Sequence, residues 1–358
     1  MTSFPEITLA NPAENVHLSA RTLSDIILLY HCVYIFSISY HINFSCRFKN
    51  YFSDYAHIII TLWKGMTIIM SSSKYSRTDL AVEMIDPDKD SLPKGIKRRI
   101  RKSSVCTITE ITVTDDIAGI RIGKPKGTYI TIETDRLSAH PEDFGEQSQN
   151  IADELTALIP DRSHILIAAL GNESITPDAL GPLTAKRVIA TRHIAGENAG
   201  AVLSELPLNM VSVLSTGVMG QTGIESSELV KAVCEKIKPS CVIVIDALAC
   251  NDISRLGTTI QLSDSGISPG SGVQNRRKEL SRDTLGVPVI AVGIPTVVDM
   301  HSIVHSITGT PPDKHLPNMM VTPRDIDKMI ERSAHLLAFA LNRAAQPELS
   351  DEDILSMM

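Results

Sequence analysis

The sequence has few aromatic residues beyond residue 75. Twelve of its fifteen Phe, Tyr and Trp residues lie at or before Tyr75, and only Tyr129, Phe144 and Phe339 follow. A core formed by the later residues must therefore be packed by aliphatic side chains, chiefly Val, Ile, Leu, Ala and Met. The abrupt change indicates that two kinds of sequence meet near residue 75.

The cysteines and charges exclude several other classes of protein. The six cysteines form no CxxC pair and show no spacing typical of a zinc site or a disulfide framework. A net charge of −7 gives no reason to expect nucleic acid or an anionic membrane as the main partner. With 43% hydrophobic and 21% charged residues, the 358-residue chain can bury one large core. The composition favours an acidic, cytoplasmic enzyme.

Residues 1–65 have a composition of their own. Their main apolar run, Ile26–Tyr40, is about fifteen residues long, which is short for a membrane span. It lacks the basic start and the cleavage site of a signal peptide. We therefore expect no membrane anchor and interpret residues 1–65 as an extension outside the fold or as sequence upstream of the true start. Met66 and Met70 are the candidate starts.

A β-rich part is predicted from residue 80 to residue 150. Residues 105–113 and 128–133 alternate apolar and polar side chains, as half-buried strands do. The residues between them supply Asp, Gly and Pro, which favour turns. This pattern predicts a small lobe or an extension of a larger sheet.

A basic run, residues 94–102, precedes these strands. Most such runs are solvated faces. The alternative is that Lys97, Arg98 and Arg101 recruit an acidic partner, because the rest of the chain is acidic and cannot steer one.

Residues 151–345 alternate apolar strands with helices, which predicts an α/β core with a mostly parallel sheet flanked by helices. The predicted strands are His164–Leu170, Cys241–Asp246 and Val287–Gly293, and the predicted helices are about Ala179–Arg192, Ser226–Lys236, Thr296–Ser306 and Pro323–Arg343. In such sheets, functional sites lie at the carboxyl ends of the strands.

Two aspartates stand at these predicted strand ends. Asp178 follows the first strand in a Thr-Pro-Asp sequence that is typical of a helix start, and Asp246 ends the second strand. Two neighbouring carboxylates can share one proton, so that one acts as a base and the other as an acid to activate water. Each is also compatible with a structural role, as a helix-start carboxylate or a loop hydrogen bonder.

Other motifs give weaker signals. The Asp-Ser-Gly at 264–266 is short, and the strand–helix alternation does not fit a pepsin-like fold. Two glycine-rich stretches, 217–223 and 266–272, could cradle phosphate, but neither has the P-loop pattern, so a nucleotide-binding or regulatory protein is an alternative. His301 and His305 lack the Glu of an HExxH zinc site. We expect no cofactor and no metal, and keep a metal-assisted peptidase as a further alternative.

From about residue 75 to residue 343, the chain resembles the germination proteases of bacterial endospores, a family of atypical aspartic endopeptidases. The stretches that carry the resemblance are Arg77–Glu83, Gly171–Pro182, Ile245–Ala249, Ile260–Gly266, Pro269–Gly272 and Val289–Val298.

The resemblance implies a fold similar to that of hydrogenase-maturation endopeptidases, and small acid-soluble spore proteins as substrates. It further implies a homotetramer in the forespore or spore core, made as a zymogen that processes itself. The catalytic aspartates proposed for the family fall on Asp178 and Asp246, and processing is expected between Asp79 and Leu80.

These inferences divide the chain into predicted parts. Residues 66–79 are the propeptide, residues 80–345 the peptidase domain and residues 346–358 a C-terminal tail.

Overall fold

The computed structural model describes residues 78–85, 92–135, 137, 142–195, 208–270, 278–310, 312–313, 315, 317 and 319–358. The predicted extension 1–65 and nearly all of the predicted propeptide lie outside these described residues.

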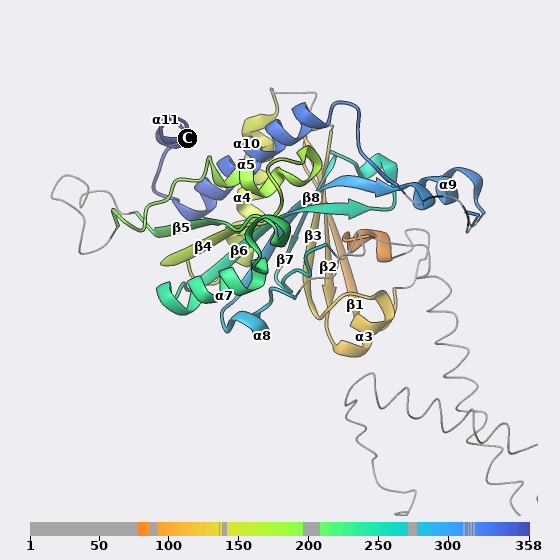
Figure 1. The fold of residues 1–358 in the computed structure, drawn as a ribbon, viewed down its shortest axis with the longest axis horizontal. Coiled ribbons are helices and arrows are strands. Elements are labelled where there is room, and N and C mark those ends of the chain that lie inside the picture. The colour runs from red at the N-terminus through yellow and green to blue at the C-terminus, as the bar shows by residue number, and fades with distance from the viewer. Residues whose placement is uncertain are drawn as a thin grey trace, which may run out of the picture. The chain divides into compact units, whose positions relative to one another are not determined.

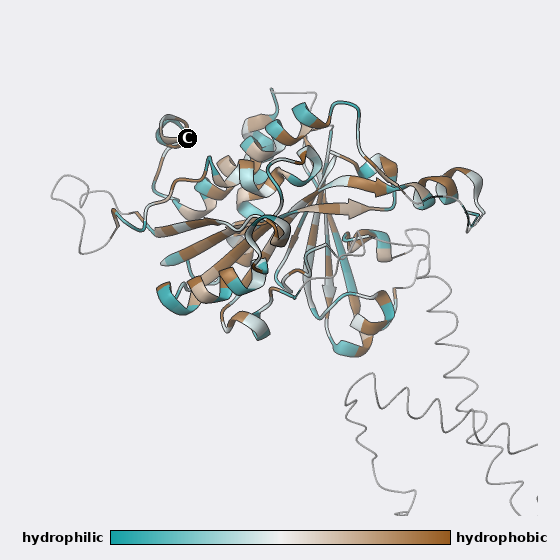
Figure 2. Ribbon diagram, viewed as in Figure 1, coloured by the Kyte–Doolittle hydropathy of each residue, from teal (hydrophilic) through white to brown (hydrophobic). Residues whose placement is uncertain are grey.

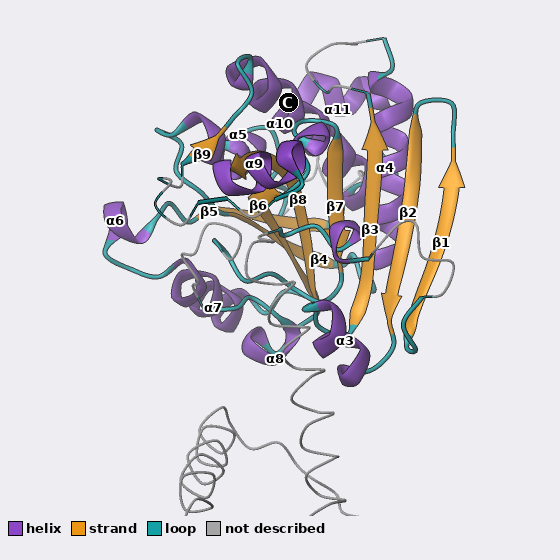
Figure 3. Ribbon diagram, turned by 90° about the vertical axis from the view of Figure 1, so that its right-hand side faces the viewer, coloured by secondary structure: helices purple, strands orange, loops and turns teal. Residues whose placement is uncertain are grey.

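One mixed sheet organises the described part of the chain. Its strands are β1 Ile96–Lys102, β2 Cys106–Val113, β3 Gly127–Thr134, β4 His164–Ala169, β5 Met210–Ser215, β6 Cys241–Cys250, β7 Thr259–Ser263, β8 Val289–Asp299 and β9 Met320–Val321. The spatial order is β1-β2-β3-β7-β8-β6-β4-β5, with β9 paired to β8 (Figures 1 and 3).

The sheet has a parallel half and an antiparallel half. β8, β6, β4 and β5 run parallel, whereas β7, β3, β2 and β1 pair antiparallel. The parallel order predicted for the core is therefore confined to four strands. Residues 103–105 join β1 to β2, and a connection this short can only make an antiparallel pair. The predicted β-rich part is a continuation of the same sheet.

Helices flank the sheet. The described helices are α3 Asp116–Ile122, α4 Phe144–Leu158, α5 Leu180–Ala185, α6 Met219–Thr222, α7 Ser226–Ile237, α8 Arg282–Leu285, α9 Met300–Thr308, α10 Ile326–Ala345 and α11 Asp351–Met357, with 3₁₀ turns η1 Val82–Met84, η2 Thr176–Asp178 and η3 Ile253–Arg255. α3 packs on β2 of the antiparallel half and α11 packs on α10, whereas both faces of the parallel half are covered. α4, α5 and α10 lie on one face, and α7 and α8 lie on the other (Figure 1). None of the described helices is long and apolar enough to cross a membrane.

The alternation of strand side chains explains the two layers of the core. Ile243 and Ile245 of β6 pack in the cluster that contains α4, α5 and α10. Val242 and Val244 pack against α7 on the opposite face. The central strands are therefore mostly apolar in sequence, and they are largely brown in Figure 2.

α10 is the main cover of the sheet and joins the C-terminal residues to it. Phe144 of α4 packs on Phe339 of α10 with ring centroids 5.3 Å apart. The guanidinium of Arg343 lies over the Phe339 ring and pairs with Asp351 of α11. The predicted C-terminal tail is thus largely helical, and its Ile354 is fully buried.

The predicted helix boundaries fail in two places. The helix expected over residues 179–192 is only the six-residue α5, preceded by the turn η2. The helix expected from Thr296 begins at Met300, because Val297 and Val298 continue β8 by pairing with β6. Asp299 then caps α9 by accepting a hydrogen bond from the Ser302 backbone at 2.9 Å.

Candidate active site

Asp178 lies in a loop that folds tightly back on the end of β4. Gly171 has a φ of +112°, and a Cβ on it would lie 2.1 Å from the Asp178 carbonyl oxygen, so only glycine fits. The Asn172 amide donates to Asp178 Oδ2 at 2.8 Å. The expected helix start is here a 3₁₀ turn, η2, with Pro177 near its start and Asp178 in its first turn, but it has no side-chain cap, and α5 begins only at Leu180. The Asn172 amide therefore helps to orient this carboxylate.

The sequence predicts that Asp246 ends its strand, but Asp246 lies inside β6, which continues to Cys250. β6 pairs with β4 only as far as Ile245, but it continues beside β8 to Cys250. Asp246 is therefore the first residue of the part of β6 that extends beyond β4 beside β8. It is buried, and its Oδ1 accepts a hydrogen bond from the Ala247 amide at 3.0 Å.

The packing of α5 brings the two aspartates to the same end of the sheet. The Leu170 amide donates to the Ile245 carbonyl at 2.9 Å, which joins the residues just before the Asp178 loop and just before Asp246. A Cβ on Gly181 would lie 2.2 Å from the Leu170 carbonyl oxygen and 3.0 Å from the Ile245 carbonyl oxygen. The backbone of α5 thus rests directly on both strands, and η2 lies beside β6 and β8.

The first glycine-rich stretch borders the same loop. Gly217 and Gly223, both at positive φ, flank α6. Gln221 of α6 donates to Asn172 Oδ1 at 2.9 Å. The stretch therefore supports the residue that orients Asp178, a role that its glycine pattern alone did not indicate.

The predicted processing site docks on the edge of β6 that β4 leaves free. The Asp79 amide donates to the Ala249 carbonyl, and the Ala249 amide donates to Asp79 Oδ2, both at 2.9 Å. Ile245 faces β4, and because alternate residues of a strand direct their amides to the same side, Ala249 faces that side too. Asp79 therefore lies in line with β4, three residues along β6 from Asp246.

The residues after the predicted cut are firmly held. Leu80 is fully buried among Leu248, Cys250, Leu256 and Val298. The Ala81 amide donates to Gln261 Oε1 at 3.1 Å.

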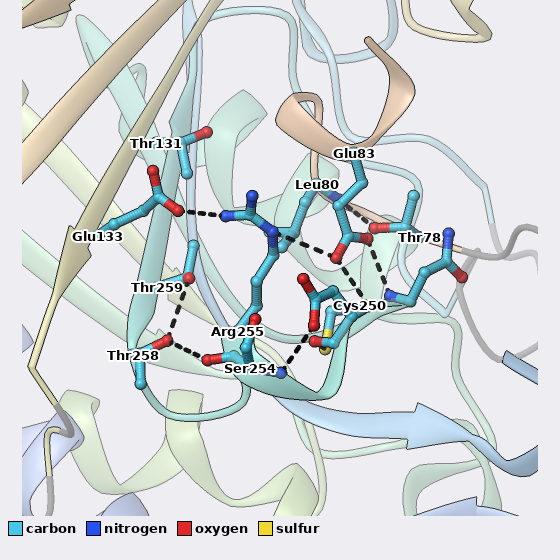
Figure 4. A network of polar contacts seen from close by, with 12 residues as sticks. Thr78, Leu80, Glu83, Thr131, Glu133, Cys250, Ser254, Arg255, Thr258 and Thr259 are labelled. Atoms are coloured by element: carbon cyan, nitrogen blue, oxygen red, sulfur yellow. Dashed lines mark hydrogen bonds and ion pairs between the residues drawn. The ribbon is translucent and has the colours of Figure 1, made fainter. Parts of the chain in front are cut away.

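Glu83 fixes the far end of this segment (Figure 4). Its carboxylate accepts the amides of Asn251 and Asp252 at 2.8 and 3.0 Å. Arg255 bridges Glu83 and Glu133, at 3.5 and 2.6 Å. Residues 80–83 are therefore part of the fold, and the contacts of residues 78–79 include β6, the Leu80 amide and one lysine.

That lysine, Lys124, was missed by the sequence analysis. It lies between α3 and β3, and its Nζ donates to the carbonyl oxygens of Asp79 at 2.7 Å and Thr78 at 3.4 Å. Burial lowers the pKa of Lys124, while the nearby carboxylates of Asp79 and Glu83 act in the opposite direction. In the sequence, Lys124 is only one residue of a Gly-Lys-Pro-Lys-Gly turn, so no local pattern marks it.

A cavity of about 320 Å³ lies beside the docked segment. Asp79, Lys124, Leu248 and Gly293 are among its lining residues. Gly293 is the β8 partner of Asp246, and Leu248 shares a face of β6 with Asp246 because strand side chains alternate. The cavity therefore lies on the sheet face to which the Asp246 side chain points.

The basic run forms β1, an edge strand that the sequence analysis did not predict. Lys97 and Arg98 are exposed, but Arg101 is bound through both terminal nitrogens to Glu154 of α4 at 2.6 and 2.8 Å. These hydrogen bonds raise the pKa of Arg101. Recruitment of an acidic partner remains a prediction, for which Lys97 and Arg98 are better placed than Arg101.

The four described cysteines are buried free thiols. Burial raises the pKa of Cys234 to about 11 and that of Cys241 to about 12. Within the described ranges, no group of three or more His, Cys, Asp or Glu side chains is arranged to hold a metal ion.

Comparison with known proteins identifies related chains. The sequence model of the family described as germination protease matches residues 78–309. The germination protease of Caldanaerobacter subterraneus subsp. tengcongensis is 37% identical over 319 residues, covering 79% of this chain and 98% of that protein. The germination protease of Bacillus mycoides is 44% identical over 243 residues, covering 64% of this chain and 65% of that protein.

Solved structures match as well. A NiFe hydrogenase maturation protease from Thermococcus kodakarensis is 19% identical, with a TM-score of 0.32, and the match covers 52% of this chain and 98% of that chain.

Proposed function

This chain belongs to the germination protease family, a family of peptidases, and from that premise we propose that it is an endopeptidase that begins the degradation of small acid-soluble spore proteins during germination. The observation that carries the proposal is the arrangement of Asp178 and Asp246, which two separate strands bring to one end of the sheet.

In the proposed mechanism the two carboxylates share one proton. The ionised carboxylate takes a proton from water as the water oxygen attacks the peptide carbonyl carbon. The protonated carboxyl then gives its proton to the departing amine nitrogen. Like charges held close together cannot both ionise cheaply, which keeps one member of such a pair protonated.

We further propose that the enzyme is made as a zymogen that cuts its own chain between Asp79 and Leu80. Two observations support this step. Asp79 is paired to β6 three residues along the strand from Asp246. Leu80, on the other side of the proposed cut, is fully buried, and Glu83 accepts two backbone amides, so the new N-terminal segment would stay in place. Asp79 lines the cavity on the sheet face to which Asp246 points, so an uncut segment would obstruct it, although neither Asp178 nor Asp246 is itself among the lining residues. Residues 66–79 would be the propeptide.

The assembly and location follow from the resemblance alone. We propose a homotetramer that acts in the forespore or spore core, with residues 1–65 dispensable. A chain shortened to begin at Met66 should process and cleave substrate at the rate of the full chain. Loss of soluble, active protein on this shortening would show that residues 1–65 are needed.

The decisive experiment is cleavage of a purified small acid-soluble spore protein by the full chain. We expect a few discrete fragments in the mass spectrum and a new enzyme N-terminus at Leu80. The Asp178→Asn variant is the matched control and should give neither. Protein that carries the Leu80 N-terminus but leaves the substrate intact would contradict the proposed substrate.

A further inference from the structure

Lys124 and Ala249 together bind the amide, the carbonyl oxygen and the side-chain carboxylate of Asp79. The Ala249 carbonyl accepts a hydrogen bond from the Asp79 amide, and the Ala249 amide donates to one Asp79 carboxylate oxygen, both at 2.9 Å. Lys124 Nζ donates to the Asp79 carbonyl oxygen at 2.7 Å. That oxygen belongs to the peptide bond at which processing is proposed. The contacts therefore surround the residue that becomes a C-terminus when the bond is cut.

Hydrolysis would change the charge at this position. Water adds to the Asp79 carbonyl carbon, the bond to the Leu80 nitrogen breaks, and that nitrogen takes both protons of the water, the second from the new carboxyl group, to become an α-ammonium group. Asp79 is left with a terminal carboxylate. The oxygen that accepts from Lys124 then carries negative charge, and a hydrogen bond between two ionised groups is shorter and stronger than one to a neutral carbonyl.

We propose that Lys124 and Ala249 form a binding site for a peptide that ends in an aspartate carboxylate, so that the severed propeptide remains bound to the processed enzyme. This proposal rests on the proposed cut between Asp79 and Leu80. It makes activation a two-step process, in which the bond is cut first and the cavity opens only when the product leaves.

When the product leaves, Lys124 loses hydrogen-bond acceptors for its ammonium group. Lys124 loses two carbonyl acceptors and the Asp79 carboxylate, and of the two carboxylates near it only Glu83 remains. An ammonium in a half-buried position is costly without acceptors. The empty site therefore favours rebinding of a carboxylate, which is the basis of retention.

The first test compares two peptides on the processed protein after its own propeptide has been removed. The peptides are acetyl-Ser-Arg-Thr-Asp, the sequence of residues 76–79, as the free acid and as the C-terminal amide. We expect the acid to bind at least about tenfold more tightly, as measured by calorimetry. Lys124→Met should abolish this preference. Lys126→Met, which alters an exposed lysine of the same loop, should preserve it.

Two results would overturn the proposal: equal affinity of acid and amide for the wild-type protein, or a preference for the acid that survives Lys124→Met. Lys124→Gln keeps a hydrogen-bond donor without its charge. It should therefore lose the acid preference even if Lys124→Met fails to fold.

A second test does not depend on processing. In the uncut chain, docking of Thr78 and Asp79 should shield the bond between Arg77 and Thr78 from trypsin. Lys124→Met should increase the rate of cleavage there several-fold, followed by mass spectrometry, with Lys126→Met again as control. An unchanged rate contradicts the Lys124 site. Absence of a Leu80 N-terminus in wild-type protein contradicts self-processing instead, so the two failures are distinguishable.

Discussion

The parallel and antiparallel halves of the sheet contribute differently to the candidate site. The parallel half, buried on both faces, positions Asp178 and Asp246 through backbone contacts between β4, β6 and α5. In the antiparallel half, Lys124 and Gln261 contact the segment that carries Asp79 and Leu80 directly. Glu133 acts on the same segment through Arg255, which pairs with Glu83. The proposed peptide cleavage therefore depends on the parallel half, and the proposed activation by processing depends on the antiparallel half. The two halves meet where β7 pairs with β8.

The largest effect should come from the carboxylates of the parallel half. Asp178→Asn and Asp246→Asn should each lower peptidase activity by about 10²–10⁴-fold, because each removes a proton-transfer group while keeping size and hydrogen bonding. If the two act as one unit, the double variant should be scarcely worse than either single variant. Thermal unfolding should change little. A folded single variant with near wild-type activity would refute the two-aspartate mechanism.

The second effect concerns how closely the parallel half is packed. Gly181→Ala should destabilise the fold by roughly 3 kcal/mol or more, because its Cβ would meet two strand carbonyls. Gly145→Ala is the control, since no atom lies within 4 Å of the added Cβ in α4. It should stabilise the protein by about 0.5–1 kcal/mol, as Ala is the better helix former. Urea unfolding would measure both, and equal effects would disprove the close approach.

The third test separates two roles within the basic strand of the antiparallel half. Arg101→Gln leaves the buried Glu154 without its ion-pair partner, so it should destabilise the fold by roughly 1–2 kcal/mol after allowance for the partial exposure of Arg101. Lys97→Gln and Arg98→Gln should leave stability unchanged, but lower the association rate with acidic substrate and flatten its salt dependence. Stopped-flow measurements of substrate binding at several salt concentrations would give the association rate and its salt dependence. An unchanged salt dependence would make β1 a merely solvated edge.

The smallest effect should be a pH dependence in the parallel half. Burial, and secondarily the charge of Arg192, lowers the pKa of His164 below its usual 6.5. Between the lowered and the usual pKa, the unfolded chain binds more protons than the folded chain, so stability is full above pH 6.5 and falls as the pH drops. His164→Gln should reduce the loss of stability between pH 7 and pH 5, whereas exposed His193→Gln should not. Denaturation midpoints at both pH values decide this.

The core strands and the two aspartates could be predicted because their signals are local. Strands buried on both faces must be continuously apolar, and Asp246 stands out as a charge after four such residues. β1 could not be predicted in this way. Only Ile96 of its seven residues is buried, so the strand shows no alternation of apolar and polar side chains.

The contact between Lys124 and Asp79 was equally out of reach. It joins residues 45 positions apart and depends on the turn after α3 meeting the edge of β6. The closeness of Gly181 to β4 and β6 is a tertiary property of the same kind. A single sequence shows a glycine there, but it gives no sign of which backbone approaches it.

The part of β6 that extends beyond β4 has a consequence for tolerance to sequence change. A free strand edge binds a chain through main-chain groups that every amino acid except proline carries, so it accepts unrelated sequences equally well. The Asp79 amide binds the Ala249 carbonyl in this sequence-independent way, but the Ala249 amide binds the Asp79 carboxylate, which few other residues could replace. Leu80 and Glu83, held by a fitted apolar pocket and by an arginine, leave equally little freedom. Variation among functional chains should therefore be concentrated ahead of Asp79 and restricted from Asp79 onward.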